Sequence, residues 1–341
     1  MSDSPRGLDL DAFGRWLADT APGLLEGPLS GEVIAGGRSN LTYRVTDGTH
    51  PVVVRRPPLG HVLATAHDMG REFRVISALA PTSVPVPEAY ASCADDTVVG
   101  APFYVMGFVD GTPYRSASEL RPLGPERTRT IGERMVDTLA DLHLVDPESV
   151  GLAEFGRPTG FLARQVRRWG AQLDASHSRS VAGIDELRRR LTERVPQESA
   201  PAIVHGDYRL DNLLVRPDDT IGAVVDWEMA TLGDPLTDVA LLLTYHRLAD
   251  LDASGAVSTA AQAPGFVTRD EVMSRYAERT GRDLSRLGFY EALACFKLAV
   301  VLEGIHYRYT QGQTVGEGFA TIGDAVEPLV ALGLESTQED D

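Results

Sequence analysis

Short apolar runs and polar clusters alternate most sharply between residues 202 and 238. Residues 202–204, 213–215 and 223–225 are apolar, and the turn signal Pro-Asp-Asp at 217–219 separates the last two runs. Short apolar runs bounded by turn residues predict buried strands. We therefore expect strands joined by a turn to present three polar side chains at one rim: Asp207, Asn212 and Asp226.

Elsewhere the pattern changes from strands to helices along the chain. In the first 108 residues, five runs predict the strands of one sheet, at 31–35, 41–46, 52–56, 89–92 and 103–106. Apolar residues at helical spacing predict helices at 8–17, 67–79, 125–144, 160–174, 270–280 and 289–309. This order predicts an α+β protein, with an antiparallel sheet in residues 1–108 and a mainly helical domain in 109–341. We expect the acidic end, 335–341, to be disordered.

Composition places the chain among ordinary globular proteins and limits its partners. The 341 residues are 43% hydrophobic, and 32 basic against 49 acidic residues give a net charge of −17. Such a charge argues against nucleic acid or an anionic membrane as the main partner. Lys297 is the only lysine, and it also interrupts the most apolar helix.

Two cysteines, Cys93 and Cys295, cannot form a disulfide framework, so we expect a reducing compartment. We find neither a leader pattern at the N-terminus nor an apolar stretch of about 18 residues. The expected location is the cytoplasm.

The three polar side chains at the predicted rim suit phosphoryl transfer. Asp207 can orient a hydroxyl nucleophile or accept its proton, while Asn212 and Asp226 carry hard oxygen ligands for Mg²⁺. The pattern H-x-D-x-x-x-x-N should occur by chance in roughly one chain of this size in a thousand. The alternative is that Asp207 and Asn212 only cap turns.

Two segments, at 205–215 and 224–240, resemble the aminoglycoside phosphotransferase-like (choline-kinase-like) enzymes. They read H-G-D-Y-R-L-D-N-L-L-V and V-V-D-W-E-M-A-T-L-G-D-P-L-T-D-V-A. They are most similar to the branch that includes kinase domains fused to acyl-CoA dehydrogenases, in which Trp or Phe follows the metal aspartate, as Trp227 does here. The resemblance implies a protein-kinase-like bilobal fold that binds ATP and Mg²⁺.

Residues 36–40, Gly-Gly-Arg-Ser-Asn, join the first two predicted strands. Glycines let backbone N–H groups approach a polyphosphate, and a nearby hydroxyl or amide adds a donor. The loop also resembles the phosphate-covering loop of the family branch, although many hairpin turns carry glycine without binding a nucleotide. The candidate nucleotide-binding residues in it are Gly36, Gly37, Ser39 and Asn40.

The third predicted strand carries Arg55 where kinase-like folds carry the phosphate-binding lysine. Strand alternation lets only one of Arg55 and Arg56 face inward, and the sequence leaves that choice open, together with an exposed edge position. Val53 shares a face with Arg55, where adenine would pack, and Glu72 on the following helix is the implied partner of Arg55.

The chain should leave the sheet near Met106 and Phe108, where the resemblance places the hinge against adenine. Further on, Arg164, Arg167 and Arg168 share one helix face and can hold a substrate's carboxylate or phosphate, or be a solvated surface. Asp238 is expected to hydrogen-bond the loop of Asp207.

Together these patterns predict a kinase that transfers the γ-phosphoryl group of ATP to a hydroxyl of a small molecule. An aminoglycoside-type antibiotic kinase and a catalytically weak nucleotide-binding protein remain as alternatives. The acceptor and the oligomeric state stay open.

Overall fold

The computed structural model of the chain describes residues 4–34, 40–59, 68–176, 179–250, 258–313 and 321–339. The chain forms two compact units. The first consists of Met1–Gly111 with Gly222–Ala230, and the second of Thr112–Ile221 with Thr231–Asp341. Neither unit is one continuous stretch of sequence.

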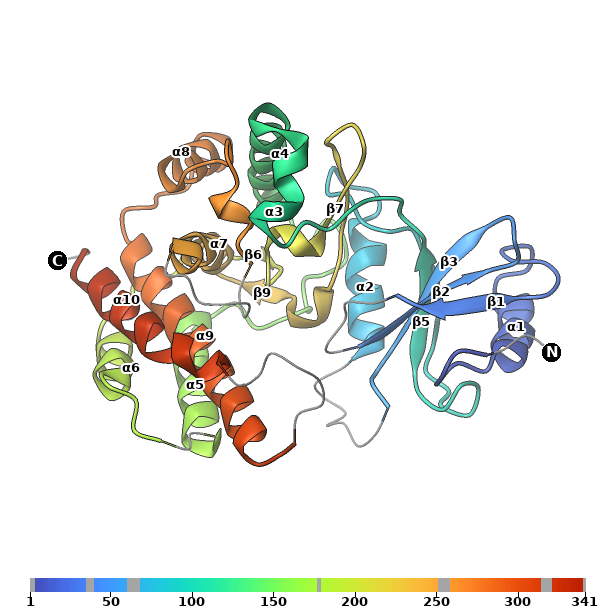
Figure 1. Cartoon of the computed structure of the whole chain (residues 1–341), viewed down its shortest axis with the longest axis horizontal. Helices are drawn as coiled ribbons and strands as arrows, with labels where there is room; N and C mark the ends of the chain where they lie inside the picture. The colour runs from blue at the N-terminus through green and yellow to red at the C-terminus, as the bar shows by residue number, and fades with distance from the viewer. Residues whose placement is uncertain are drawn as a thin grey trace. The chain divides into compact units, whose positions relative to one another are not determined.

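A five-stranded antiparallel sheet forms the core of the first unit (Figure 1). The strand order is β1-β2-β3-β5-β4. The sequence prediction of five antiparallel strands is therefore confirmed. The strands are β1 (Ser30–Val33), β2 (Leu41–Thr46), β3 (Pro51–Arg56), β4 (Ala89–Cys93) and β5 (Phe103–Gly107).

Two helices cover opposite faces of this sheet, α1 (Leu10–Thr20) and α2 (Met69–Leu79) (Figure 1). Successive side chains of a strand point to opposite faces, and β5 shows this directly. The ring of Phe103 lies 4.6 Å from that of Trp16 in α1, while the ring of Tyr104 lies 6.1 Å from that of Phe73 in α2. Polar groups of the sheet that point toward α2 are thereby separated from the apolar cluster under α1.

The second unit is mainly helical. Its helices are α3 (Ala117–Leu120), α4 (Pro125–Leu144), α5 (Phe161–Ser176), α6 (Ile184–Glu193), α7 (Leu236–Asp250), α8 (Arg269–Thr280), α9 (Leu287–Thr310) and α10 (Val326–Glu339). Short 3-10 turns occur at Arg121–Leu123, Leu210–Asn212, Ala260–Gln262 and Ile322–Ala325, and in the first unit at Trp227–Met229.

Among the short strands, β6 (Ala202–Val204) pairs antiparallel with β9 (Thr231–Gly233). The other two are β7 (Leu213–Val215) and β8 (Ile221–Val224), as the apolar runs predicted. The α+β class predicted from the sequence is confirmed.

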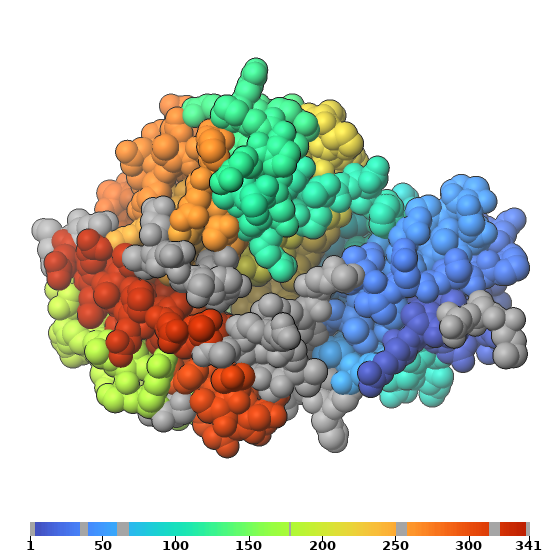
Figure 2. Space-filling view, in the orientation of Figure 1, coloured from blue at the N-terminus to red at the C-terminus, as the bar shows by residue number. Residues whose placement is uncertain are grey.

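Helices α4 and α8 lie side by side on one face of the second unit (Figure 2). Charged pairs join them: Arg275 Nε lies 2.7 Å from Asp137 Oδ1, and Arg279 Nη2 lies 2.5 Å from Asp141 Oδ1. Such partly exposed pairs each contribute about 1 kcal/mol or less to stability. No helix of the described residues is both long and apolar enough to cross a membrane.

The prediction of a disordered acidic end was wrong for residues 335–339, which continue α10. Ser336 and Thr337 are buried, and each has an arginine donor from another helix. Arg247 Nη1 lies 2.9 Å from Ser336 Oγ, and Arg190 Nη1 lies 3.0 Å from Thr337 Oγ1. These long-range partners order a segment whose acidic composition alone suggests disorder.

Candidate functional site

The loop that carries Asp207 leaves β6 and is held by one buried carboxylate. Asp238, at the start of α7, accepts hydrogen bonds from the backbone N–H of His205 (2.7 Å) and of Gly206 (2.8 Å). Gly206 has φ of 82°, a left-handed conformation that glycine adopts without strain. The predicted hydrogen bonding of Asp238 to this loop is confirmed.

A buried histidine completes the support of Asp238. His143 Nε2 lies 3.3 Å from Asp238 Oδ2, and His143 Nδ1 lies 2.7 Å from the Tyr276 hydroxyl. Burial lowers the pKa of His143, because the charged imidazolium is poorly solvated there. Burial alone would raise the pKa of Asp238, but the hydrogen bonds that it accepts lower it below its ordinary value.

Asp207 has both carboxylate oxygens oriented by neighbours in the second unit. The Tyr245 hydroxyl donates to Oδ1 (3.1 Å), and Asn212 Nδ2 lies 3.3 Å from Oδ2 and donates to the Asp207 carbonyl (2.9 Å). Arg209 Nε lies 3.5 Å from Oδ2. The side-chain amide of Asn212 directs its nitrogen toward Asp207. Its oxygen, on the other side of the amide group, could therefore bind a cation.

Two residues of this neighbourhood were missed by the sequence analysis, Tyr245 and Lys297. Burial raises the pKa of Tyr245 well above its ordinary value, and the charge of Asp207 raises it further, so the hydroxyl stays a neutral donor. Lys297 Nζ donates to the carbonyl oxygen of Gly206. A signal existed for Tyr245: it stands seven residues after Asp238, two helical turns along one face.

In the first unit, Arg55 rather than Arg56 points toward α2. Arg55 Nε lies 2.9 Å from Glu72 Oε2, and Arg55 Nη2 also pairs with Asp226 Oδ1. Arg56, on the opposite face, donates to the carbonyl of Val99 (2.7 Å). Burial raises the pKa of Glu72 and the charge of Arg55 opposes this, so the pair is held in a poorly solvated environment.

Asp226 follows β8 in a left-handed conformation, with φ of 68° and ψ of 59°. Only one other non-glycine residue of the described chain has positive φ, Asp219 in a turn. Such strain costs of order 1 kcal/mol and occurs most often at functional sites. In this conformation the Asp226 carboxylate pairs with the side chain of Arg55.

Asn40 is the one predicted loop residue that the structure describes; Gly36, Gly37 and Ser39 lie outside the described residues. Its Nδ2 lies 3.1 Å from Glu72 Oε1 and 3.1 Å from Glu228 Oε2. The amide therefore joins the cluster of Arg55, Glu72 and Asp226 from the N-terminal side.

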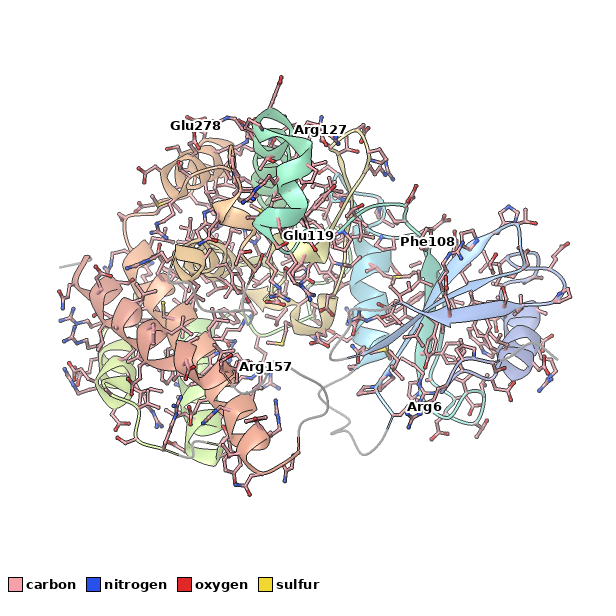
Figure 3. All side chains as sticks on the ribbon, viewed as in Figure 1. Arg6, Phe108, Glu119, Arg127, Arg157 and Glu278 are labelled. Atoms are coloured by element: carbon pink, nitrogen blue, oxygen red, sulfur yellow. The ribbon has the colours of Figure 1, made fainter. Side chains whose placement is uncertain are left out.

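The three residues predicted to face adenine lie on or beside β3 and β5. Val53 and Met106 are directly opposed across these strands and are both buried, on the same face as Arg55. Phe108, which is labelled in Figure 3, follows β5 and is 38% exposed. The guanidinium of Arg44 lies 5.3 Å from the centre of its ring. Val53, Met106 and Phe108 form an apolar surface next to the charged cluster.

The candidate magnesium ligands come from different units, Asn212 from the second and Asp226 from the first. Over the residues that the structure describes, no group of three or more His, Cys, Asp or Glu side chains could hold a metal ion. A set of one amide oxygen and one carboxylate still suits Mg²⁺, which keeps waters and substrate phosphates in its remaining positions.

Comparison with known proteins gives the family. Residues 30–279 match the sequence model of the phosphotransferase enzyme family. The chain is 35% identical to acyl-CoA dehydrogenase family member 11 of Rattus norvegicus over 304 residues, which cover 88% of this chain and 39% of that protein. It spans about two fifths of the length of this relative.

Comparison with solved structures supports the same family and shows the fold. A protein of Ralstonia eutropha JMP134, provisionally described as an aminoglycoside phosphotransferase, is 33% identical with a TM-score of 0.84, over 97% of this chain and 98% of that chain. Choline kinase of Cryptosporidium parvum Iowa II is 13% identical with a TM-score of 0.65, over 97% and 96%, and shows the same kinase-like fold. The predicted family and kinase-like fold class are confirmed: the chain belongs to the phosphotransferase enzyme family.

Proposed function

We propose that this protein transfers the γ-phosphoryl group of ATP to a hydroxyl of a small molecule. The observation that carries the proposal is the orientation of Asp207 in a member of this family. Its carboxylate is held by Tyr245 and Asn212, on a loop fixed by Asp238. A carboxylate so oriented suits alignment of an acceptor hydroxyl and removal of its proton.

The residues of the first unit would bind the nucleotide. Arg55, kept in place by Glu72, would contact phosphate oxygens with its fixed charge and planar donors. Gly36, Gly37, Ser39 and Asn40 would contribute amide and side-chain donors around the same phosphates.

The adenine ring would pack on the apolar side chains beside the charged cluster. Val53 and Met106 form one buried face, and Phe108 offers an exposed ring at the end of β5. Backbone groups near Met106 and Phe108 would meet the edge of the base.

Asn212 and Asp226 would hold Mg²⁺. Their donor chemistry fits, because both offer oxygen atoms and Asp226 is held in a strained conformation that fixes its carboxylate. The bound ion would neutralise charge on the phosphoryl group. This chain's own contribution is orientation: Asp207 aligns the hydroxyl and receives its proton, and Tyr245 keeps Asp207 in position.

Turnover of ATP with Mg²⁺ tests the proposal. The acceptors to compare are hydroxy acids, hydroxyacyl-CoA compounds and aminoglycosides, and the variants are Asp207→Ala, Asp226→Ala and, as a matched control, Asp137→Ala on α4. We expect Asp207→Ala to keep nucleotide binding but to lose turnover by about 10²-fold or more. Asp226→Ala should abolish the Mg²⁺-dependent thermal stabilisation by nucleotide.

Asp226→Asn separates the two roles of Asp226, because the amide oxygen can still accept from Arg55 while the charge is lost. Unchanged turnover in both alanine variants would reject the assignment. Nucleotide binding without transfer to any acceptor would favour the catalytically weak binding protein.

The cytoplasmic location stays a prediction. Both cysteines are free and buried in the structure.

A further inference from the structure

The only lysine of the chain lies next to the loop of Asp207. Among 32 basic residues, Lys297 alone is not arginine. It lies on α9, and its Nζ donates to the carbonyl oxygen of Gly206, the residue immediately before Asp207. A lysine presents a compact charge with three donors, where arginine presents a flat fork. The sole exception to arginine therefore occurs beside the candidate catalytic residue.

The ring of Trp169 is contacted by two cations, Lys297 and Arg168. Lys297 Nζ lies 5.7 Å from the ring centre of Trp169, and the guanidinium carbon of Arg168 lies 5.2 Å from it. Both distances fit cation–π contacts. Arg164 belongs to the same predicted basic face of α5, but it donates hydrogen bonds to the carbonyl oxygens of Thr159 and Arg157.

Neither cation forms an ion pair with an acidic side chain in the described part of the chain, although Asp207 and Asp238 lie close enough to raise the pKa of Lys297. Nζ of Lys297 has one hydrogen-bond acceptor there, the Gly206 carbonyl, so two of its three donors are unused. Arg168 forms no ion pair there, whereas Arg188 on the neighbouring α6 lies 2.7 Å from Asp174. In a chain with a net charge of −17, carboxylates were abundant for such pairing.

Both carboxylates and cations act on Nζ. Burial lowers the pKa of Lys297, Asp207 and Asp238 raise it, and Arg168 and Arg209 lower it. An anion bound near Lys297 and Arg168 would offset part of the repulsion between them. A cationic ligand would add to the repulsion.

We propose that Lys297, together with Arg168, is a charge-selective wall of the acceptor site, which favours acceptors that carry an anionic group near the hydroxyl. The inference rests on the proposed function in one respect, that Asp207 receives the acceptor hydroxyl. Lys297 would bind the anionic group with the donors that Gly206 leaves free. It would disfavour acceptors of aminoglycoside type, whose ammonium groups are repelled.

Because Lys297 is the only lysine, its amine can be observed alone. Protein produced with lysine labelled with ¹⁵N at Nζ carries the label in this side chain alone, and the amine keeps its charge and its three donors. The probes are 3-hydroxybutyrate, 1,3-butanediol and 4-amino-2-butanol, which share a secondary hydroxyl and differ in charge. The difference between glycerol 3-phosphate and glycerol gives the effect of a phosphate group, which can then be compared with the effect of the carboxylate of 3-hydroxybutyrate. Lys297→Arg removes the signal and so assigns it.

We expect saturable shifts of the Lys297 resonance with the anionic probes and none with the neutral or cationic ones. Equal responses to all probes, or no response to either anion, would overturn the proposal. This readout needs no turnover. Selective anion binding without any transfer would therefore reject the proposed function and keep the site.

Acceptor kinetics give the second test. Lys297→Met keeps the length of the side chain and removes its charge, while Lys297→Arg keeps the charge. We expect Lys297→Met to raise KM for anionic acceptors about 10-fold more than KM for neutral acceptors, since one charge-assisted hydrogen bond to the anionic group is lost. Lys297→Arg should keep the charge preference. An equal fall in kcat for all acceptors in Lys297→Met would show that the residue only holds the Gly206 loop, and would contradict the proposal.

Discussion

At the scale of single residues, His246 is a buried base without a hydrogen-bond partner among the described residues. It lies on α7, its Nε2 atom is unsatisfied, and its ring packs edge-on against Phe266 at 5.6 Å. Burial lowers the pKa of His246 to about 4, and the charge of Arg269 lowers it further. The folded protein therefore keeps this ring neutral over a range in which an unfolded histidine is charged.

His246→Leu should make the free energy of unfolding less dependent on pH. Between about pH 6.5 and 4 the unfolded chain binds a proton that folded His246 does not, so acid destabilises the wild type by up to about 3 kcal/mol through this residue. The variant should match or slightly exceed the wild type at pH 7.5 and gain on it as pH falls. Urea unfolding at pH 7.5, 6, 5 and 4.5 measures the difference.

The exposed His50, replaced by leucine, is the control for this measurement. If the curve of His246→Leu runs parallel to that of the wild type, the buried ring is not kept neutral by folding.

The candidate residues differ in how far the sequence could identify them. Asp207, Asn212 and Asp226 could be proposed from the sequence because their types and spacing are typical of one chemistry. The choice between Arg55 and Arg56 needed the structure, since alternation shows that they face apart but not which face meets α2. Lys297 reaches the loop of Asp207 only through the packing of α9, across about 90 residues of sequence.

At the scale of elements, the start of α7 supports the loop after β6 through a single carboxylate. Asp238 is almost fully buried and serves two backbone N–H groups as well as His143. An amide in its place has one acceptor oxygen, so one of these donors would face an NH₂ group.

Asp238→Asn should lower the free energy of unfolding by about 1 to 3 kcal/mol, because a buried donor loses its acceptor. It should also lower kcat by about 10-fold or more, since a small displacement of Asp207 disturbs the alignment of the acceptor. The control is Asp137→Asn on α4, whose partly exposed pair with Arg275 should contribute no more than about 1 kcal/mol. Equal effects of the two substitutions on kcat would argue against a positioning role of Asp238.

Elements were predicted best where the pattern is local. The strands and the long helices follow from apolar spacing, which neighbouring residues determine. The helix α10 was missed at 335–339 because its order depends on Arg190 and Arg247, which precede it by about 90 residues or more. Composition cannot show such a partner.

At the scale of the whole molecule, the first unit includes the segment Gly222–Ala230, which lies more than 100 residues after Gly111 in the sequence. The segment is tied into the unit by specific bonds. Arg71 Nη2 donates to the Ala230 carbonyl (3.0 Å), and the backbone N–H of Val224 donates to the Pro85 carbonyl (2.8 Å). Trp227, nearly fully buried, donates to the Val224 carbonyl (3.0 Å).

Residues 1–111 expressed alone should therefore be unstable, although they contain the whole five-stranded sheet. Without residues 222–230, Arg55 and Asn40 each lose one partly exposed carboxylate partner, and loss of the nearly fully buried Trp227 side chain costs about 3 to 5 kcal/mol. That loss is comparable to the entire stability of a small domain.

Joining residues 222–230 to residue 111 through a flexible linker should restore cooperative unfolding. The same linked fragment with Asp226→Ala and Trp227→Ala should not regain it. Circular dichroism during urea unfolding distinguishes them. A fragment 1–111 as stable as the linked one would mean that the segment only packs on a sheet that is complete without it.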